Sequence, residues 1–246
     1  MKHQFVRAIL FASLITTTLA APEKGSKAEK DKSAVWAFMP DPSLPNVLIL
    51  GDSISIGYTL QVRKNLKGKA NVFRPMRGSR PMNCSGTISG VDRLDKWLEG
   101  KKWSVIHFNW GLHDLKHVKK LGKSVKSNDP KDPTQATLEQ YTQNMETIVK
   151  KLKATGARLI FATTTPVVPG TLNPLRTPEA PVRYNAAAVK IMKANNIPVN
   201  DLHAYALPHL AKWQLPKNVH FKGVGSEALA KKVAEAISKE LAAVKQ

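Results

Sequence analysis

Short runs of apolar residues alternate along the chain with longer segments of helical periodicity. Asn46–Leu50 and residues 103–108 and 158–163 have the length of strands buried on both faces, and a briefer run covers residues 197–199. Helical segments stand between these runs. This order predicts an α/β protein, a three-layer α/β/α sandwich with a central parallel sheet.

Two apolar stripes predict helices that cover the sheet. The first repeats every three or four residues and is followed by Gly156, which favours a helix end, and the second repeats every four residues near the C-terminus. We expect both stripes to pack into the core and to carry no function. They consist of Leu138, Tyr141, Met145, Ile148 and Leu152, and of Leu229, Val233, Ile237 and Leu241.

Two long segments follow neither pattern. Residues 113–134 are polar and rich in lysine, and residues 166–181 are rich in proline and contain Arg176. Loops of this length in a compact domain are usually functional or disordered.

The N-terminus has the pattern of a cleaved signal peptide. Lys2 and Arg7 precede a mostly apolar, uncharged run over residues 8–19. This run is shorter than the roughly 20 residues that cross a bilayer. We therefore expect a signal peptide at residues 1–20, a flexible linker at 21–33, one domain at 34–246, and a secreted or periplasmic protein. A retained N-terminal anchor is the alternative.

The charge of the chain predicts a strongly basic surface. It has 38 Lys and Arg against 18 Asp and Glu, a formal net charge of +20. Such a surface attracts polyanions of any kind, although export argues against nucleic acid as the partner, and the alternative is a basic surface that serves solubility alone. Cys84 is the sole cysteine, so no intramolecular disulfide can form. Nothing in the sequence indicates an oligomeric state.

The residues after the first predicted strand can carry chemistry. Ligands bind at the carboxyl ends of the strands in a parallel sheet. Gly51 allows a tight turn there, and Ser53 would stand at the N-terminus of the next helix, where N–H groups create a positive end. Asp52 can hydrogen-bond the backbone and hold the turn. Taken alone, Gly-Asp-Ser would be an ordinary helix cap.

Further motifs follow in the order of the SGNH (GDSL-like) hydrolase family, and the resemblance spans nearly the whole domain. Residues 85–90 (Ser-Gly-Thr-Ile-Ser-Gly) are similar to the family's Gly-x-Thr-x-x-Gly block, residues 111–114 (Gly-Leu-His-Asp) to Gly-x-Asn-Asp, and residues 217–220 (Lys-Asn-Val-His) to Asp-x-x-His. The resemblance implies a flavodoxin-like fold, Ser53 as the nucleophile and His220 as its base. Cys84 as a catalytic residue is the weaker alternative.

The resemblance also implies an oxyanion hole. Its donors would be the N–H of Ser53, the N–H of Ser85 or Gly86, and the side chain of His113, which stands where the family has asparagine. A neutral imidazole has one N–H donor and can replace the amide, whereas an imidazolium would also add positive charge. A structural role for His113 is the alternative.

The partner of His220 is the main departure from the family pattern. Lys217 replaces the acidic residue three positions before the histidine, and Asn218 offers only an amide. We expect a backbone carbonyl of residues 216–218, or a distant carboxylate such as Asp201, to orient the imidazole. Asp114 is expected to brace its own loop. The base should be weaker than in a triad with a carboxylate.

These features favour an exported serine esterase that hydrolyses an ester, with acetyl as the expected acyl group, on an acidic or sulfated extracellular carbohydrate. Other reactions open to the same nucleophile are lipid ester hydrolysis, hydrolysis of O-acetyl esters on peptidoglycan, acyl transfer and attack on a sulfate ester. Lys217 and His113 motivate an alternative of another class, a catalytically retired domain that binds a polyanionic glycan.

A metal site is a further possibility that the sequence raises. The spacing of His107, His113 and His117 resembles a ligand set, but His107 lies inside a predicted strand and the SGNH family needs no metal. We therefore expect neither a metal nor a cofactor.

Overall fold

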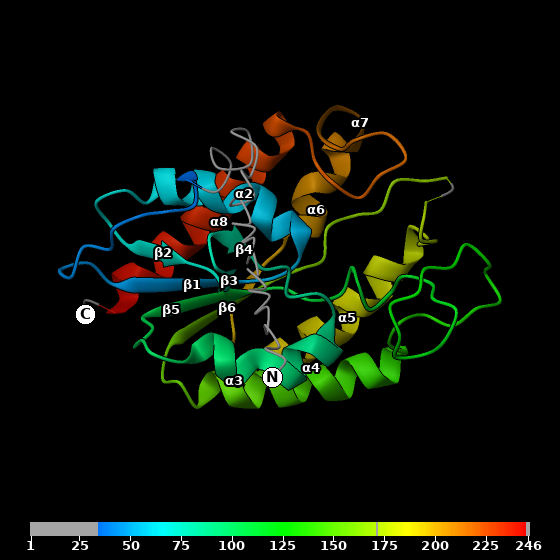
Figure 1. Ribbon diagram of the computed structural model, residues 1–246, viewed down its shortest axis with the longest axis horizontal. Coiled ribbons are helices and arrows are strands. Elements are labelled where there is room, and N and C mark those ends of the chain that lie inside the picture. Colours follow the sequence, from blue (N-terminus) through cyan, green and yellow to red (C-terminus); the bar gives the residue numbers. More distant parts are fainter. Residues whose placement is uncertain (1–33, 171, 245–246) are drawn as a thin grey trace, which may run out of the picture.

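Five parallel strands form the central sheet of the computed structural model, which describes residues 34–170 and 172–244. They lie in the order β2-β1-β5-β6-β7, which is the flavodoxin-like order (Figure 1). The strands are β1 (Asn46–Leu50), β2 (Asn71–Phe73), β5 (Val105–Phe108), β6 (Arg158–Ala162) and β7 (Val199–Asn200). All but β2 coincide with or overlap the apolar runs, so the predicted α/β fold with a parallel sheet is confirmed.

Helices cover both faces of the sheet and make it the middle of three layers (Figure 1). One layer contains α2 (Ser53–Asn65), α6 (Leu202–Ala206), α7 (Leu210–Trp213) and α8 (Gly223–Val244). The opposite layer contains α3 (Thr87–Leu98), α4 (Leu138–Lys153) and α5 (Glu179–Ala194). Small elements complete the chain: a hairpin of β3 (Met76–Arg77) and β4 (Arg80–Pro81), and a 3₁₀ turn at Leu207–His209.

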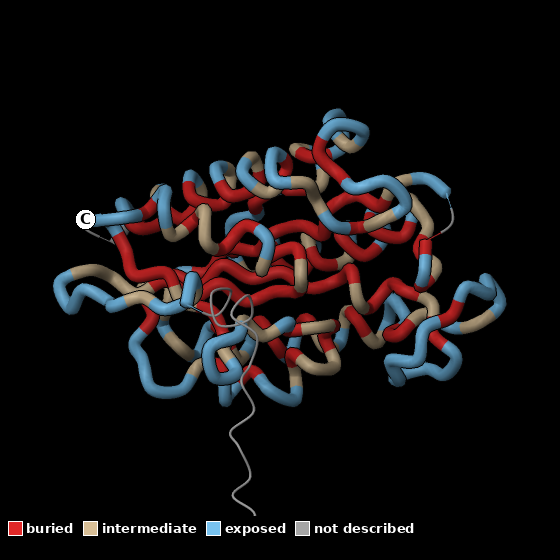
Figure 2. Tube along the Cα trace, turned by 45° about the horizontal axis from the view of Figure 1, so that its top comes forward, coloured by how far each residue is buried: buried red, intermediate tan, exposed pale blue. Residues whose placement is uncertain are grey.

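The strands are continuously apolar because alternate side chains enter two different cores. Val47 and Ile49 of β1 join the core under α2 and α8, whereas Leu48 and Leu50 join the core over α3, α4 and α5. The sheet is accordingly a buried layer between two half-exposed ones (Figure 2).

The two predicted helices form where their stripes indicate. Thr137 begins α4 with a reciprocal capping box to Gln140, and Gly156, with a φ of 71°, follows its end. The stripes are buried as expected except for Leu138, which is 39% exposed because it is the first residue of α4.

Hydrogen bonds join the two long segments that follow neither pattern. The N–H of His117 donates to the carbonyl of Leu175 at 2.9 Å, and the N–H of Leu175 donates to the carbonyl of Ser127 at 2.9 Å. Residues 179–181 of the second segment belong to α5. Both loops lie at the carboxyl end of the sheet, on the right in Figure 1.

The N-terminal predictions fall outside the described part of the chain. The expected signal peptide at residues 1–20 and the linker at 21–33 are not among the described residues. Within residues 34–170 and 172–244, no helix combines the length and the hydropathy required to cross a membrane.

Candidate active site

The candidate nucleophile lies at the switch point of the sheet, between β1 and β5. Ser53 is the first residue of α2, and the preceding Asp52 caps that helix, its Oδ1 accepting the N–H of Ile54 at 2.9 Å. Burial raises the pKa of Asp52. Asp52 therefore holds the turn, as the sequence indicated, and leaves Ser53 half-buried at a helix N-terminus.

The hydroxyl of Ser53 and the ring of His220 are in direct contact. Ser53 Oγ lies 2.8 Å from His220 Nε2, although the two residues are 167 positions apart in the sequence. His220 comes from the loop before α8 and is exposed. The structure thus brings together the two residues that the motifs single out.

The other ring nitrogen of His220 contacts the side chain of Asn218. Asn218 Oδ1 lies 2.7 Å from His220 Nδ1 and also accepts the backbone N–H of His220 at 3.0 Å. Because a backbone N–H can only donate, the atom that it meets is the amide oxygen. Nδ1 then carries the ring proton, and the lone pair of Nε2 faces the hydroxyl of Ser53.

This contact corrects the sequence-based expectation that a backbone carbonyl or a distant carboxylate would orient His220. Lys217 has a φ of 50°, in the left-handed region that residues with a Cβ rarely adopt. Asn218 follows directly after this turn, and the backbone N–H of His220 holds its amide oxygen beside the ring. The motif contains Asn218, but no residue type in it indicates the turn at Lys217.

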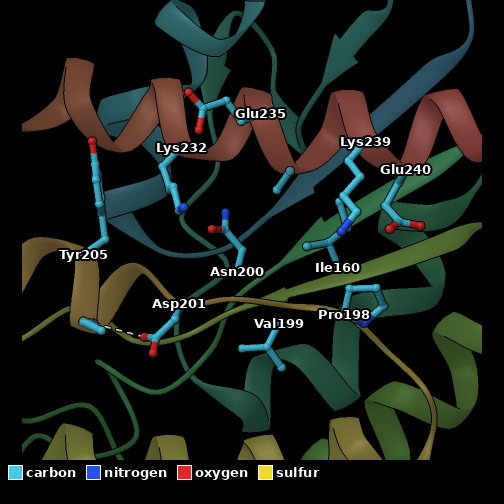
Figure 3. A pocket seen from close by; sticks show the side chains of 12 residues that line it. Ile160, Pro198, Val199, Asn200, Asp201, Tyr205, Lys232, Glu235, Lys239 and Glu240 are labelled. Atoms are coloured by element: carbon cyan, nitrogen blue, oxygen red, sulfur yellow. Dashed lines mark hydrogen bonds between the residues drawn. The ribbon is translucent and has the colours of Figure 1, made fainter.

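Asp201, the carboxylate considered for His220, has a different place. Its Oδ1 accepts the N–H of Ala204 at 3.0 Å and the hydroxyl of Thr163 at 2.8 Å, so it caps α6. Figure 3 shows it beside β7, in a pocket of about 630 Å³ that α8 lines with Lys232, Glu235, Lys239 and Glu240. This pocket is larger than the one at Ser53 and lacks a paired nucleophile and base.

Asp114 ties two motifs together rather than bracing only its own loop. Its Oδ1 accepts the N–H of Thr87 at 2.8 Å and the hydroxyl of Thr87 at 2.6 Å, at the start of α3. Burial raises the pKa of Asp114 to about 6. The loops that hold Gly86 and His113 are therefore fixed relative to each other by one carboxyl group.

The two candidate backbone donors of the second motif differ. Ser85 has a φ of 56°, and its N–H donates to Asn83 Oδ1 at 2.8 Å. Within the described residues no hydrogen bond uses the N–H of Gly86, which precedes α3. Gly86 also fits tightly, since an added Cβ would meet Asp114 Oδ1 at 2.9 Å.

His113 lines the same pocket as Ser53 and His220. Burial lowers the pKa of His113 to about 3, and the positive charges of Lys116, Arg176 and His220 add to the effect. The ring is therefore neutral at physiological pH, which decides between the two protonation states considered from the sequence. A neutral ring offers one N–H donor.

The pocket at Ser53 has a volume of about 350 Å³ and a basic lining. Lys116 and Lys126 come from the first long loop, Arg176 from the second, and Lys217 from the loop of His220. From the sequence, Arg176 and the lysine-rich segment that contains Lys116 and Lys126 were predicted only as parts of long loops, because their approach to Ser53 depends on how the loops pack. No lining residue among those described is acidic.

The sequence matches the model of a known protein family. The GDSL-like lipase/acylhydrolase family matches residues 49–228, a span that contains Ser53, Asn218 and His220. The chain belongs to this family. It is an ester-hydrolysing serine hydrolase, as the motifs predicted.

Solved structures show that this GDSL-like hydrolase has the fold expected of its family. The acetyl xylan esterase AlAXEase has a TM-score of 0.61 at 16% identity, over 78% of this chain and 99% of its own. A lipase/acylhydrolase from Enterococcus faecalis has a TM-score of 0.61 at 20% identity, over 78% and 95%. A putative acylhydrolase from Bacteroides fragilis has a TM-score of 0.61 at 17% identity, over 86% and 94%. No curated protein matches the sequence.

The histidines considered as metal ligands do not converge in the described part of this GDSL-like hydrolase, which holds no group of three or more His, Cys, Asp or Glu suited to a metal ion. His107 is buried in β5 with its Nε2 3.3 Å from the amide nitrogen of Asn200. His117 Nδ1 lies 2.7 Å from the carbonyl of Asp132. Cys84 is buried, and burial raises the pKa of its thiol to about 11, which leaves it a poor nucleophile.

Proposed function

We propose that the protein is an O-acetyl esterase acting on an extracellular carbohydrate, with Ser53, His220 and Asn218 as its catalytic relay. The observation that carries this proposal is the hydrogen-bonded line from Ser53 Oγ through the imidazole of His220 to Asn218 Oδ1, with distances of 2.8 and 2.7 Å. A histidine held by asparagine instead of a carboxylate also serves the cysteine proteases of the papain type.

The relay supports a two-step acyl transfer. Ser53 Oγ attacks the ester carbonyl while its proton passes to His220 Nε2. The C–O bond of the tetrahedral intermediate then breaks, and the leaving sugar oxygen takes that proton from His220 to become a hydroxyl. Water hydrolyses the acetyl-serine in the same manner, with His220 again as base. Asn218 keeps Nε2 free of its proton at the start of each step, because its oxygen holds the proton on Nδ1.

Three donors are proposed for the oxyanion. The N–H of Ser53 lies at the helix N-terminus, the N–H of Gly86 is unused in the described structure, and neutral His113 can present one ring N–H. Of the two backbone alternatives in the second motif, the engaged N–H of Ser85 favours Gly86. Loss of one such donor typically lowers kcat about 10²–10³-fold.

The composition of the pocket supports a carbohydrate over a lipid. A lipid acyl chain is bound by apolar surface, whereas four cationic side chains and His113 line the space beside Ser53. The acetyl xylan esterase among the structural neighbours supports the acetyl group by analogy of fold. The signal-peptide pattern of residues 1–20 supports an exported enzyme.

A chain-length series tests this proposal. We expect kcat/KM for 4-nitrophenyl acetate to exceed that for 4-nitrophenyl octanoate at least about tenfold, and acetate to be released from acetylated oligosaccharides. A preference for octanoate, with no acetate released from any acetylated oligosaccharide, would favour a lipid esterase.

A further inference from the structure

Lys116 is a buried lysine whose charge the fold leaves unpaired. The residue as a whole is 7% exposed, and its ammonium group makes no hydrogen bond or ion pair with any residue in the described part of the chain. The ammonium nitrogen itself is not fully enclosed, because Lys116 lines the pocket at Ser53. A charge that is partly withdrawn from water and has no partner is less favourable than a fully solvated one. Burial, together with the charges of Arg176 and Lys126, lowers the pKa of Lys116.

Arg176 stands beside Lys116 in the same pocket and is also 7% exposed. Its Nε donates to the carbonyl of Leu112 at 2.9 Å and its Nη1 to the carbonyl of Pro174 at 3.4 Å. Both acceptors are neutral, so Arg176 is held in position without losing its charge to a carboxylate. Burial lowers the pKa of Arg176 to about 10, and the group remains charged at neutral pH.

The nearest carboxyl groups do not neutralise this pair. Asp52 and Asp114 influence Arg176 and Lys116 through space, but each accepts hydrogen bonds from the backbone elsewhere, and neither forms an ion pair in the described structure. Lys126 and Lys217 add exposed positive charge at the mouth of the same pocket.

We propose that Lys116 and Arg176 form an anion subsite beside the nucleophile, which binds a carboxylate or sulfate group of the sugar that carries the ester. The proposal rests on the esterase function and adds the residues that select an acidic substrate. A carboxylate or sulfate would supply the negative partner that Lys116 and Arg176 lack among the described residues. The planar guanidinium of Arg176 suits such groups because it can donate paired hydrogen bonds to them. The general surface charge then attracts the polymer, while the subsite selects the acidic sugar.

The decisive variant is Lys116→Met, which keeps the length of the side chain and removes its charge. Lys120→Met is the matched control, because Lys120 is an exposed residue of the same loop and does not line the pocket. For the wild type, we expect kcat/KM on acetylated oligogalacturonate to exceed that on acetylated xylo-oligosaccharide at least about tenfold. Lys116→Met should lose most of this preference and retain activity on 4-nitrophenyl acetate, and Lys120→Met should match the wild type.

Binding to the Ser53→Ala protein tests the subsite without turnover. Trigalacturonic acid and a sulfated trisaccharide are titrated separately, so that carboxylate and sulfate are distinguished. We expect at least one of them to bind about tenfold or more weakly once Lys116→Met is added. Equal affinity for both ligands with and without Lys116 would overturn the proposal.

Thermal unfolding supplies an independent readout. Removal of a partly desolvated charge that Arg176 and Lys126 repel should raise the melting temperature of Lys116→Met by about 2–4 °C, while Lys120→Met stays at the wild-type value. A melting temperature that does not rise would contradict the absence of a partner for Lys116. If the wild type, Lys116→Met and Lys120→Met all fail to hydrolyse 4-nitrophenyl acetate, the esterase function is wrong. The titration of Ser53→Ala still tests the anion subsite in that case.

Discussion

The polar side chains on the two sides of the pocket at Ser53 differ in whether they find partners within the chain. On one side, Ser53, His220 and Asn218 each find a hydrogen-bond partner within the chain. On the other side, Lys116 is buried with no partner among the described residues, and Arg176 contacts only carbonyls. This difference is what the two proposals require: a relay that is assembled before substrate binds, and a basic side that the substrate completes.

The largest expected effect comes from removal of the nucleophile. Ser53→Ala should lower kcat on 4-nitrophenyl acetate by about 10⁴-fold or more, as loss of a serine nucleophile does elsewhere. The melting temperature should change little, because no core cavity opens. Ser124→Ala, at an exposed serine of the long loop, serves as control. Retained turnover in Ser53→Ala would remove Ser53 from the mechanism.

Asp114 offers a smaller effect, on stability and its dependence on pH. Its pKa rises from 3.8 to about 6 in the folded protein, so the folded state holds its proton more tightly than the unfolded state. The stability associated with Asp114 is therefore complete below about pH 4 and is lost as pH rises through about 6. This difference amounts to about 3 kcal/mol.

Urea unfolding at pH 4 and pH 7.5 measures this dependence. Relative to Asp114→Asn, which cannot ionise, the wild type should lose about 3 kcal/mol of unfolding free energy between the two pH values. Identical pH dependence in the two proteins would show that Asp114 ionises in the fold as it does in an unfolded chain.

High salt should lower kcat/KM several-fold on an acidic substrate and much less on a neutral one. Exposed charges such as those of Lys126 and Lys217 are screened at high ionic strength, whereas the contacts within the relay are short. Between 50 and 500 mM NaCl, kcat/KM on an acidic acetylated oligosaccharide should fall several-fold, and that on 4-nitrophenyl acetate less than about twofold. Equal salt dependence of both rates would remove the role of the exposed lysines.

Much of the fold could be predicted because its signals are local. The apolar run of β1 ends at Gly51 and gives the strand without error, whereas β2 has only three residues, Asn71–Phe73, and no run to recognise. The short β7 was shifted: Ile197 lies before the strand and packs into the core on the α4 side, and pairing begins at Val199.

A site residue could be predicted from the sequence only where it belongs to a recognisable motif. Ser53 and His220 follow from such motifs. The role of Asn218 depends on the positive φ of Lys217, which the residue type does not suggest. Lys116 and Arg176 are 60 positions apart in the sequence. Their approach depends on hydrogen bonds between the two long loops, and no local pattern encodes those bonds.

The central claim is that the amide oxygen of Asn218 orients His220, and pH profiles of kcat/KM on 4-nitrophenyl acetate test it most directly. Asn218→Ala should lower kcat/KM about 10- to 10²-fold, the value of a hydrogen bond to a group that becomes charged. Asn218→Asp should equal or exceed the wild type and move the acidic limb of the profile to higher pH, because a carboxylate stabilises the imidazolium. A wild-type profile in Asn218→Ala would contradict the account.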